Sequence, residues 1–268
     1  MTKSEPHTAA RTSPRIALVT GASRGIGQAI AAGLAQAGFD LMITARTASA
    51  LETVADHLGR ETGSRIDMLA GDLREPAFAE ALVTATIDRF GQLDLLVNNA
   101  GATKRGPFLD LTEADWQDGF ALKFFGTVRL CRAAWPYLQV VGGQIVNIIG
   151  AGGRTPTAEF TIGGSVNAGL MNFTKALADQ GLADGVRVNG INPGAIRTDR
   201  LQTRILRFAH EQGIDPEEAA SLMVQDQRIM RFGEPEEIAA VVAFLAAGGG
   251  TYLHGALIDV DGGTTKGL

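Results

Sequence analysis

Short apolar runs alternate with longer segments of helical periodicity along most of the chain, and this alternation constrains the fold more than any other feature. The apolar runs have the length and composition of buried strands, and they cover residues 16–20, 41–45, 66–70, 94–98, 144–149, 186–191 and 256–260. The helical patterns between them cover residues 25–37, 49–62, 76–90, 112–139, 160–182, 200–228 in pieces, and 235–247. This order predicts an α/β fold with one doubly wound parallel sheet of about seven strands and helices on both faces. A ligand is expected beyond the carboxyl ends of the strands.

The chain has the size of one domain, because 268 residues without a repeat or a linker can bury a single substantial core. We expect residues 1–14 to form a flexible polar tail and residues 15–268 to form the domain. The net charge of −5 argues against a general nucleic-acid-binding protein. No apolar run approaches the roughly 20 residues that span a bilayer, and the first residues lack the apolar core of a secretory signal. The single cysteine, Cys131, excludes an internal disulfide, and the cytoplasm is the expected location.

Three glycines follow the first predicted strand, in the stretch VTGASRGIGQAIAAGLAQAG from residue 19 to residue 38. Gly21 allows the sharp exit from the strand, Gly25 lets the backbone approach a diphosphate, and Gly27 lets the following helix pack closely on the sheet. The amino end of that helix offers free N–H groups and a positive dipole to phosphate groups. The stretch therefore predicts a dinucleotide site in a single Rossmann-type domain.

The end of the second predicted strand indicates which dinucleotide binds. An enzyme that uses NAD usually has an acidic residue there, which accepts hydrogen bonds from the ribose 2′-OH. In this chain the strand ends in ITARTAS, with Arg46 and no carboxylate, and Arg24 lies in the glycine loop. Two guanidinium groups without an acid favour a 2′-phosphate, so NADP(H) is the preferred cofactor and NAD(H) is the alternative.

From residue 16 to residue 263 the chain resembles the short-chain dehydrogenase/reductase family. The resemblance rests on six motifs in order: TGASRGIG (20–27), GDL (71–73), NNAG (98–101), NPGAIRT (192–198), RFGEPEEIA (231–239) and GALIDVDGG (255–263). It implies that Asp72 binds the adenine and that Ile196 and Thr198 hold the carboxamide of the nicotinamide. The cofactor-binding residues implied in this way are Gly21, Ser23, Arg24, Gly25, Ile26, Gly27, Arg46, Asp72, Leu73, Asn99, Ala100, Gly101, Pro193, Gly194, Ile196 and Thr198.

The resemblance also implies a catalytic tetrad of Asn, Ser, Tyr and Lys, and none of the four is present at its expected place. Lys123 stands at the asparagine place and Gly150 at the serine place. Gly163 stands at the tyrosine place and Asn167 at the lysine place. Neither of the two tyrosines in the chain has a lysine four residues later, so a shifted alignment does not restore the pair. Because general acid catalysis is typically worth about 10²–10⁴-fold, we expect ordinary carbonyl reduction to be weak or absent.

Lys123 is the strongest candidate for a replacement, since its amine could reach the space left by the missing tyrosine and lysine. A partly desolvated lysine has its pKa lowered toward neutrality and can act as an acid, a base or a Schiff-base amine. The alternative is a lysine that fills space or pairs with a carboxylate. Asn167 is a candidate for bonding the cofactor ribose through its amide. Glu159, Thr161 and Ser165 flank the tyrosine place and are further candidate catalytic groups.

Segment 199–231 corresponds to the substrate lid of the family. Arg200, Arg204 and Arg207 are four and three residues apart, which places them on one face of a helix. Arg154 lies in the loop after the fifth predicted strand. Arg154, Arg200 and Arg204 are therefore candidates for binding an anionic small-molecule substrate, and a solvated helix face is the alternative.

Three functions fit the sequence. The first is an NADP(H)-binding oxidoreductase with a rebuilt proton path. The second is lyase or hydrolase chemistry around Lys123, and the third is a non-catalytic dinucleotide-binding protein. The NPGAIRT segment favours the first, because holding a nicotinamide ring in place serves hydride transfer. No metal site is predicted, and the resemblance implies a homodimer or homotetramer formed through the helices in 112–139 and 160–182.

Overall fold

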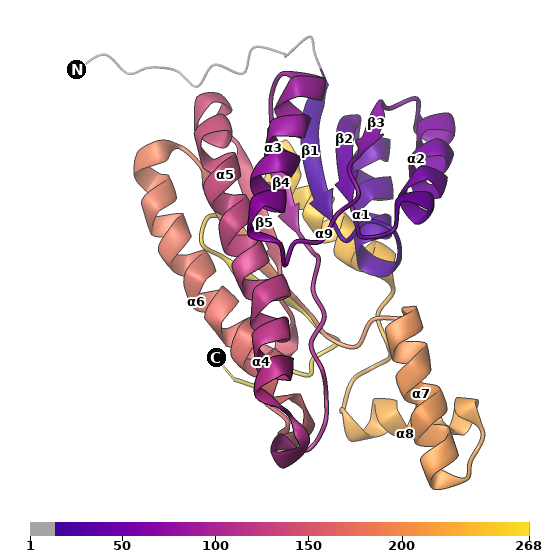
Figure 1. Ribbon diagram of the computed structural model, residues 1–268. Helices are drawn as coiled ribbons and strands as arrows, with labels where there is room; N and C mark the ends of the chain where they lie inside the picture. The colour runs from indigo at the N-terminus through magenta and orange to yellow at the C-terminus, as the bar shows by residue number, and fades with distance from the viewer. Residues whose placement is uncertain (1–13, 268) are drawn as a thin grey trace.

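The computed structural model describes residues 14–267, so the predicted tail lies almost entirely outside the described residues. Within the described part, seven strands form one parallel sheet in the order β3-β2-β1-β4-β5-β6-β7 (Figure 1). The strands are β1 (Arg15–Thr20), β2 (Phe39–Thr44), β3 (Ile66–Met68), β4 (Leu95–Asn98), β5 (Gln144–Ile148), β6 (Arg187–Pro193) and β7 (Leu257–Val260). The predicted α/β fold with about seven parallel strands is confirmed.

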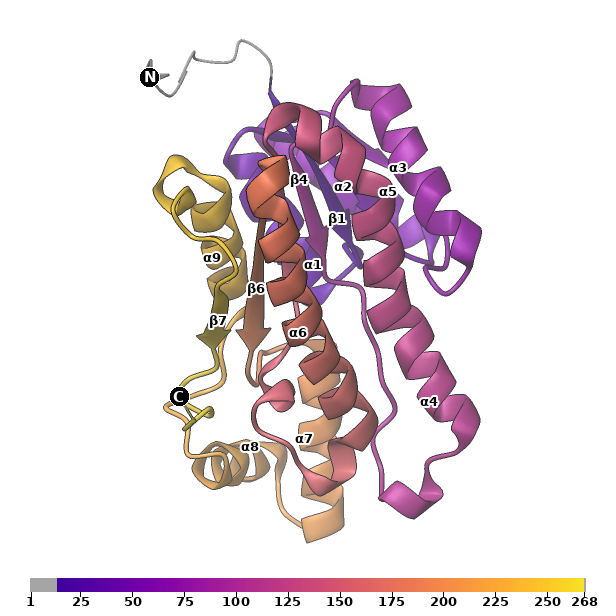
Figure 2. The ribbon, with the colours of Figure 1, turned by 90° about the vertical axis from the view of Figure 1, so that its left-hand side faces the viewer.

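Two layers of helices cover the sheet. One layer consists of α1 (Gly25–Gln36), α2 (Ala48–Thr62) and α9 (Pro235–Ala246). The other consists of α3 (Pro76–Phe90), α5 (Gly126–Val141) and α6 (Thr161–Asp184), and Figure 2 shows α5 and α6 in front of the sheet. Short 3₁₀ helices are η1 (Phe108–Asp110), η3 (Ala151–Gly153), η4 (Ala158–Phe160) and η5 (Gly248–Gly250). Among residues 14–267, no helix combines the length and apolar character needed to cross a membrane.

Strand β1 shows why the predicted strands are continuous apolar runs. Ala17, Leu18 and Val19 are all 0% exposed. Because successive side chains of a strand point to opposite faces, Ala17 and Val19 join the core formed with α1 and α9, whereas Leu18 joins the core formed with α3 and α5. A strand that is covered on both faces has no polar side, which explains the absence of alternation in the sequence.

The carboxyl ends of the strands carry the segments that resemble the family motifs. The glycine turn follows β1 and the NNAG segment follows its neighbour β4, at the point where the strand order reverses; open α/β sheets bind ligands at such a point. Beyond this edge, α7 (Asp199–Gln212) and α8 (Pro216–Asp226) pack on each other through a small apolar core of their own (Figure 1). These two helices occupy most of segment 199–231.

One helical pattern differs from its prediction. Residues 112–139 are predicted as a uniform helix, but α4 (Glu113–Gly119) and α5 are joined by a π-helical segment, η2 (Phe120–Phe125). A π-helical turn holds an extra residue, and such turns are rare in general but frequent at functional sites. Lys123 lies within this segment. The apolar periodicity gave no sign of the extra residue, because the segment itself, FALKFF, is apolar at every position except Lys123 and has no periodic pattern.

Candidate active site

The turn between β1 and α1 has a shape that suits glycine. Gly21 has a φ of 66° and Gly25 a φ of 56°, in the left-handed region that other residues rarely adopt. A Cβ on Gly27 would lie 2.2 Å from the carbonyl oxygen of Gly21 and 2.4 Å from Nδ2 of Asn99. These distances leave no room for a side chain at position 27. The turn and the close approach of α1 to the sheet therefore both depend on glycine.

Thr20 and Asn99 fasten this turn to the end of β4. The Thr20 hydroxyl accepts hydrogen bonds from the backbone N–H groups of Asn99 and Ala100, both 2.9 Å long. The Asn99 side-chain amide donates to the carbonyl oxygens of Thr20 at 2.9 Å and Gly21 at 3.3 Å. The amide nitrogen of Asn99 therefore stabilises the turn through these two hydrogen bonds.

The amino end of α1 fits a phosphate group. Arg24, at the N-cap position, makes no side-chain capping hydrogen bond, and the first turn of α1 contains no acidic residue. The N–H groups of such a helix end remain available to an anion, and the helix dipole favours negative charge there. Across from it, a Cβ on Gly25 would lie 3.2 Å from Cγ2 of Thr198, so the NPGAIRT segment faces the turn. Backbone N–H groups, glycine and a threonine together match what a diphosphate requires.

Two arginines at this edge of the sheet are accessible to a ligand. Arg46 follows β2, is exposed, and makes no ion pair with the part of the chain that the structure describes. Arg24 is also exposed, and its Nη1 lies 3.7 Å from Oδ2 of Asp199, with both side chains more than 70% exposed at 73% and 81%. An ion pair in such an exposed position contributes little, so both guanidinium groups are free to bind an anion.

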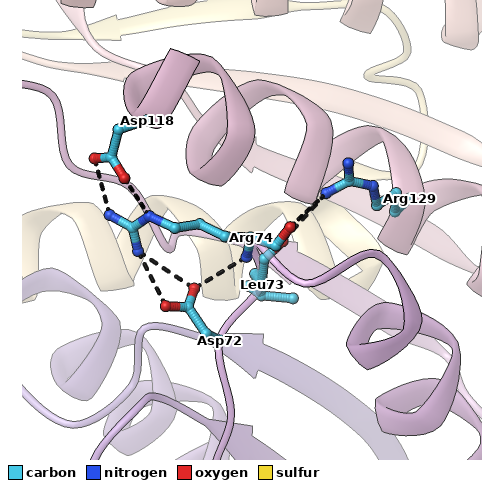
Figure 3. A network of polar contacts seen from close by, with 5 residues as sticks. All are labelled: Asp72, Leu73, Arg74, Asp118 and Arg129. Carbon is cyan, nitrogen blue, oxygen red and sulfur yellow. Dashed lines mark hydrogen bonds and ion pairs between the residues drawn. The ribbon is translucent and has the colours of Figure 1, made fainter. Parts of the chain in front are cut away.

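Asp72 is held by Arg74 in a network that Figure 3 shows. The Arg74 backbone N–H donates to Oδ1 of Asp72 at 3.0 Å, and its Nη1 lies 3.3 Å from both carboxylate oxygens. The same guanidinium donates to Asp118 of α4 at 2.5 and 3.0 Å, and this hydrogen bonding keeps the pKa of Asp118 below its usual value. Arg129 adds hydrogen bonds to the carbonyl oxygens of Leu73 and Arg74. The loop after β3 is therefore fixed against α4 and α5.

The other residues of the implied cofactor site lie in or next to the same four loops. They lie at or just after the carboxyl ends of β1, β3, β4 and β6, with Pro193 the last residue of β6 and Ile26 in the first turn of α1. They are Ser23, Ile26, Leu73, Ala100, Gly101, Pro193, Gly194 and Ile196. Ile196 is 7% exposed and forms a parallel bridge with Gly233, which ties the NPGAIRT segment to the residues just before α9. The backbone of this segment is thereby held in place beside the glycine turn.

Lys123 extends from the π-helical segment toward the end of β5. Its amine donates hydrogen bonds to the carbonyl oxygen of Ile149 and, at 2.7 Å, to Oδ1 of Asn167 on α6. Its aliphatic part packs on Gly101, where a Cβ would lie 2.8 Å from Cδ of the lysine. Burial, and to a smaller extent the charge of Arg200, lowers the pKa of Lys123 to about 7. The amine therefore changes its protonation state near neutral pH.

Lys123 and Asn167 stand at the places that the sequence resemblance assigns to the asparagine and the lysine of the tetrad. Asn167 is 2% exposed, and a Cβ on Gly150 would lie 2.9 Å from its Nδ2. From the opposite helix, the Lys123 amine reaches the residue that stands at the lysine place. Asn167 thus positions Lys123, a contact that the sequence pattern does not indicate because the two residues are 44 positions apart.

Phe160 fills the space at the tyrosine place. A Cβ on Gly163 would lie 2.1 Å from Cε2 and Cζ of Phe160, and a Cβ on Gly152 would lie 2.8 Å from its Cε1. The ring therefore lies between the start of α6 and the loop after β5. The absence of a side chain at position 163 has not left a void, and the only sequence signal for this contact is the three-residue spacing of Phe160 and Gly163 at a helix start.

The three other catalytic candidates are not brought to the amine. Glu159 is exposed, and its carboxylate lies 3.9 Å from the guanidinium of Arg207 on α7. The Thr161 hydroxyl is buried and has no hydrogen-bond partner among the described residues. Ser165 is exposed on α6. None of the three forms a hydrogen bond with Lys123 in the described part of the chain.

The candidate substrate arginines fall into two places. Arg154 lies 3.6 Å from Asp259 of β7. Arg200 donates to the carbonyl oxygen of Gly101 at 3.0 Å, which ties α7 to the segment after β4. Arg204 lies one helical turn further along α7 and is half-buried. Arg200 and Arg204 therefore lie on the lid side of the pocket, whereas Arg154 interacts with the last strand.

A fourth arginine, Arg105, joins this group although its sequence context gave no sign of it. Its guanidinium carbon lies 3.9 Å from the centre of the Phe160 ring. Burial first, and then the charge of Arg204, lowers the pKa of Arg105 to about 10. Arg105 lies in the irregular segment between β4 and η1, where neither helical nor strand periodicity assigns a direction to a side chain.

Comparison with known proteins identifies the family. Residues 15–206 match the sequence profile described as short chain dehydrogenase. An uncharacterised oxidoreductase of Mycobacterium tuberculosis is 35% identical over 257 residues, which are 95% of this chain and 94% of that protein. The chain belongs to the short-chain dehydrogenase/reductase family.

Two solved structures of reductases or oxidoreductases are similar over nearly the whole chain. L-Sorbose reductase from Gluconobacter frateurii, in complex with NADPH and L-sorbose, is 33% identical with a TM-score of 0.91, covering 96% of this chain and 98% of that chain. An NADPH-bound short-chain oxidoreductase from Pseudomonas aeruginosa, described as containing an atypical catalytic center, is 28% identical with a TM-score of 0.86, covering 95% of this chain and 98% of that chain. These similarities confirm the single Rossmann-type domain of this short-chain dehydrogenase/reductase.

Proposed function

We propose that this short-chain dehydrogenase/reductase is an NADP(H)-dependent oxidoreductase in which the Lys123 amine takes over proton transfer at the substrate oxygen. The placement of that amine carries the proposal. It is held by the Ile149 carbonyl oxygen and by Asn167, and its pKa is about 7. An acid is most effective when its pKa lies near the working pH, because both protonation states are then available.

The residues around the glycine turn support binding of the cofactor. The uncapped end of α1 and Gly25 would hold the diphosphate, Thr198 and Ile196 the nicotinamide side, and Arg46 with Arg24 the 2′-phosphate. NADPH is bound in the two similar structures described above, which supports the same cofactor here. Bound NADPH supplies a hydride, and the proton then has to come from the protein.

The charged form of Lys123 would supply this proton. Its amine has donors to spare, since an ammonium group carries three N–H bonds and the structure gives it two acceptors. Asn167 and Ile149 direct two of these bonds, which leaves the third for a substrate oxygen. Without a tyrosine, and with Phe160 over Gly163, we expect ordinary ketones to be reduced slowly. Substrates that develop less charge on oxygen, such as activated or enolic compounds, suit this arrangement better.

The test is a calorimetric titration with NADPH and NADH, followed by a panel of carbonyl compounds monitored at the nicotinamide absorbance. We expect NADPH to bind at least about 10-fold more tightly than NADH. In Lys123→Met, turnover should fall by about 10²–10⁴-fold while the affinity for NADPH changes little. The matched control is Lys175→Met, which removes an exposed lysine from the same pair of helices. Turnover that survives in Lys123→Met would contradict the proposal.

The pH dependence gives a second readout. Because the acid form of Lys123 is populated below its pKa of about 7, the rate of reduction should be highest below pH 7 and fall as the pH rises above it. Tight NADPH binding without any turnover would instead favour the two alternatives, lyase or hydrolase chemistry at Lys123 or a non-catalytic dinucleotide-binding protein. A non-redox activity that is lost in Lys123→Met would select the first of these two.

We further propose a homodimer or homotetramer formed through α4, α5 and α6. Three large hydrophobic side chains on α5 and α6 are exposed, namely Tyr137 at 39%, Val140 at 84% and Leu182 at 72%. Apolar groups exposed together on neighbouring helices commonly mark a protein–protein interface. A cytoplasmic location stays a prediction from the sequence.

A further inference from the structure

Two half-buried arginines, Arg105 and Arg204, belong to segments that come together at Glu159. The backbone N–H of Gly106 donates to the carbonyl oxygen of Glu159 at 3.1 Å, and Arg207, one helical turn from Arg204, lies 3.9 Å from the Glu159 carboxylate. Arg105 comes from the segment after β4, and Arg204 comes from α7. Neither has a carboxylate within ion-pair distance in the part of the chain that the structure describes, although the structure contains ion pairs at most of its other pocket arginines. Among residues 14–267, the Arg105 guanidinium has one ring or ion contact, with Phe160, whose ring centre lies 3.9 Å from its carbon.

The charge of Arg204 acts on the Arg105 guanidinium. After burial, the charge of Arg204 is the largest influence that lowers the pKa of Arg105, and Glu159 partly opposes it. Burial and the charge of Arg207 likewise lower the pKa of Arg204. Arginine stays charged at any physiological pH, so the repulsion cannot be relieved by loss of a proton. Partly desolvated like charges are unfavourable unless an anion compensates them.

The pair is continuous with the candidate active site. Phe160, beneath the Arg105 guanidinium, is the ring that covers Gly163. On the other side, Arg200 of α7 bonds the carbonyl oxygen of Gly101, and Gly101 packs on the side chain of Lys123. An anion held by the two arginines would therefore belong to a molecule that also reaches the Lys123 amine.

We propose that Arg105 and Arg204 bind an oxyanion group of the substrate, either a carboxylate or a phosphate. The substrate class is then an anionic carbonyl or enol compound, an inference that rests on the proposed oxidoreductase function for its reaction but not for its binding. Guanidinium forks match the two oxygens of a carboxylate or phosphate, and two forks from different segments can bind the same group together. Phe160 supports the Arg105 fork through its ring face, which holds the charge in place without neutralising it.

A substitution at Glu159 should change the anion affinity in the opposite direction from substitutions at the two arginines. Its carboxylate raises the pKa of both arginines through its charge, yet the nearest guanidinium to it is that of Arg207, at 3.9 Å. Glu159 therefore weakens the positive potential at the pair without occupying it. Removing its charge should strengthen anion binding, whereas removing either arginine should weaken it.

The experiment is a titration of succinate and of inorganic phosphate into the full-length protein, with and without saturating NADPH. We expect Arg105→Gln and Arg204→Gln each to weaken binding of the preferred anion by about 10- to 100-fold, and Glu159→Gln to strengthen it by about 2- to 5-fold. The arm with the tighter ligand, succinate or phosphate, identifies the oxyanion. Arg65→Gln is the matched control, because Arg65 is exposed at the other end of the sheet and also lies over a phenylalanine ring, Phe90, at 4.7 Å.

A folding defect is separated from a binding defect by two further measurements. Thermal unfolding of each variant shows whether it is folded, and Arg105→Lys keeps the charge but loses the fork, so its affinity should lie between those of wild type and Arg105→Gln. Equal anion binding by wild type, Arg105→Gln and Arg204→Gln overturns the proposal. Succinate and phosphate are also titrated without cofactor. The anion-binding result can therefore be interpreted even if the protein binds no NADPH and the proposed oxidoreductase function is wrong.

A pair of substrates completes the test. An oxo acid and its methyl ester have the same carbonyl group and differ in charge. The wild-type protein with NADPH should turn over the acid with a kcat/KM at least about 10-fold above that of the ester, and Arg204→Gln should reduce this ratio toward one. A ratio near one in the wild type overturns the assignment of the anion to the substrate.

Discussion

The glycine turn and the α5–α6 side of the pocket each contain a glycine whose position has no room for a side chain, but different parts of the protein take up that room. At Gly27, a side chain would meet a backbone carbonyl oxygen at 2.2 Å, and a backbone cannot move without moving β1 and α1. At Gly163, a side chain would meet the ring of Phe160 at 2.1 Å, and a ring can turn or be replaced. The first glycine is fixed by the fold, the second by a neighbouring side chain.

This difference explains why one half of the pocket follows the pattern of the family and the other does not. Diphosphate binding uses N–H groups and chain geometry, which survive as long as the fold survives. Proton transfer, as proposed here, would use side chains, and two residues at other sequence positions can meet to form such a site, as the hydrogen bond between Lys123 and Asn167 illustrates. A substitution on the α5–α6 side is therefore expected to affect catalytic activity more than it affects the fold.

The largest effect is expected at the backbone-enforced glycine. Gly27→Ala should lower the free energy of unfolding by about 3 kcal/mol and weaken NADPH binding by about 100-fold, because α1 must move away from the turn. The control is Gly33→Ala in the same helix, where a Cβ would lie 3.4 Å from that of Ala239, an ordinary contact. That variant should be unchanged or slightly more stable, by up to about 1 kcal/mol. Equal behaviour of the two variants in thermal unfolding and titration would contradict the comparison.

The next effect concerns the buried amine and its dependence on pH. The pKa of Lys123 is about 7 in the folded protein and near 10.5 when exposed, so between these values the unfolded chain binds more protons. The free energy of unfolding should therefore rise with pH in this window, and wild type should gain about 2 kcal/mol relative to Lys123→Met between pH 7.5 and 9.5. Denaturant unfolding at both pH values measures the difference. The buried Cys131 thiol, whose pKa is raised to about 12, acts equally in both proteins and cancels.

If wild type and Lys123→Met show the same change between the two pH values, the amine is not desolvated as the structure indicates. A variant that keeps the lysine and changes its partner sharpens the result. Asn167→Asp places a carboxylate at the amine, which raises the pKa of Lys123 in the folded protein. This shift raises the lower limit of the pH window and therefore narrows it. The same shift should appear in the pH profile of turnover.

A smaller effect is expected on the cofactor side, at Arg46. Arg46→Asp should reduce the preference for NADPH over NADH by about 10-fold or more, since it removes a cation from the end of β2 and adds an acid there. Calorimetric titration with both dinucleotides measures the ratio. Arg60→Asp makes the same change of charge at an exposed position in α2 and should leave the ratio unaltered. A ratio that stays constant in Arg46→Asp would assign the preference elsewhere, with Arg24 as the next candidate.

The sequence predicts more of the structure of the glycine turn than of the α5–α6 side of the pocket. The strands, the turn at Gly21 to Gly27 and the absence of the tetrad follow from local patterns, because each depends on residues that are close together in the chain. The meeting of Lys123 with Asn167 depends on the packing of two helices and on the π-helical segment, which leaves no periodic signal. Likewise, Arg105 meets Phe160 only because the segment after β4 folds beside the start of α6.

The smallest effect tests whether the ring of Phe160 is what excludes a side chain at position 163. On its own, Gly163→Ala should destabilise the protein by about 1 kcal/mol, because the gain in helix propensity is smaller than the cost of displacing the ring. In a Phe160→Ala background the same change should be neutral or stabilising, since the atoms at 2.1 Å are gone. Thermal unfolding of the two single variants and the double variant gives a coupling energy, expected at about 1–2 kcal/mol.

Gly59→Ala in α2 is the control for this cycle, because the nearest atom to its Cβ would be 3.7 Å away and only helix propensity should change. It should show no coupling to Phe160→Ala, which lies far from α2. Additive effects of Gly163→Ala and Phe160→Ala would mean that position 163 is constrained by the backbone, like position 27. In that case a tyrosine could not be restored on α6 by side-chain changes alone. The backbone itself would then exclude a tyrosine at position 163, and the proposed proton transfer by Lys123 would be a consequence of the fold.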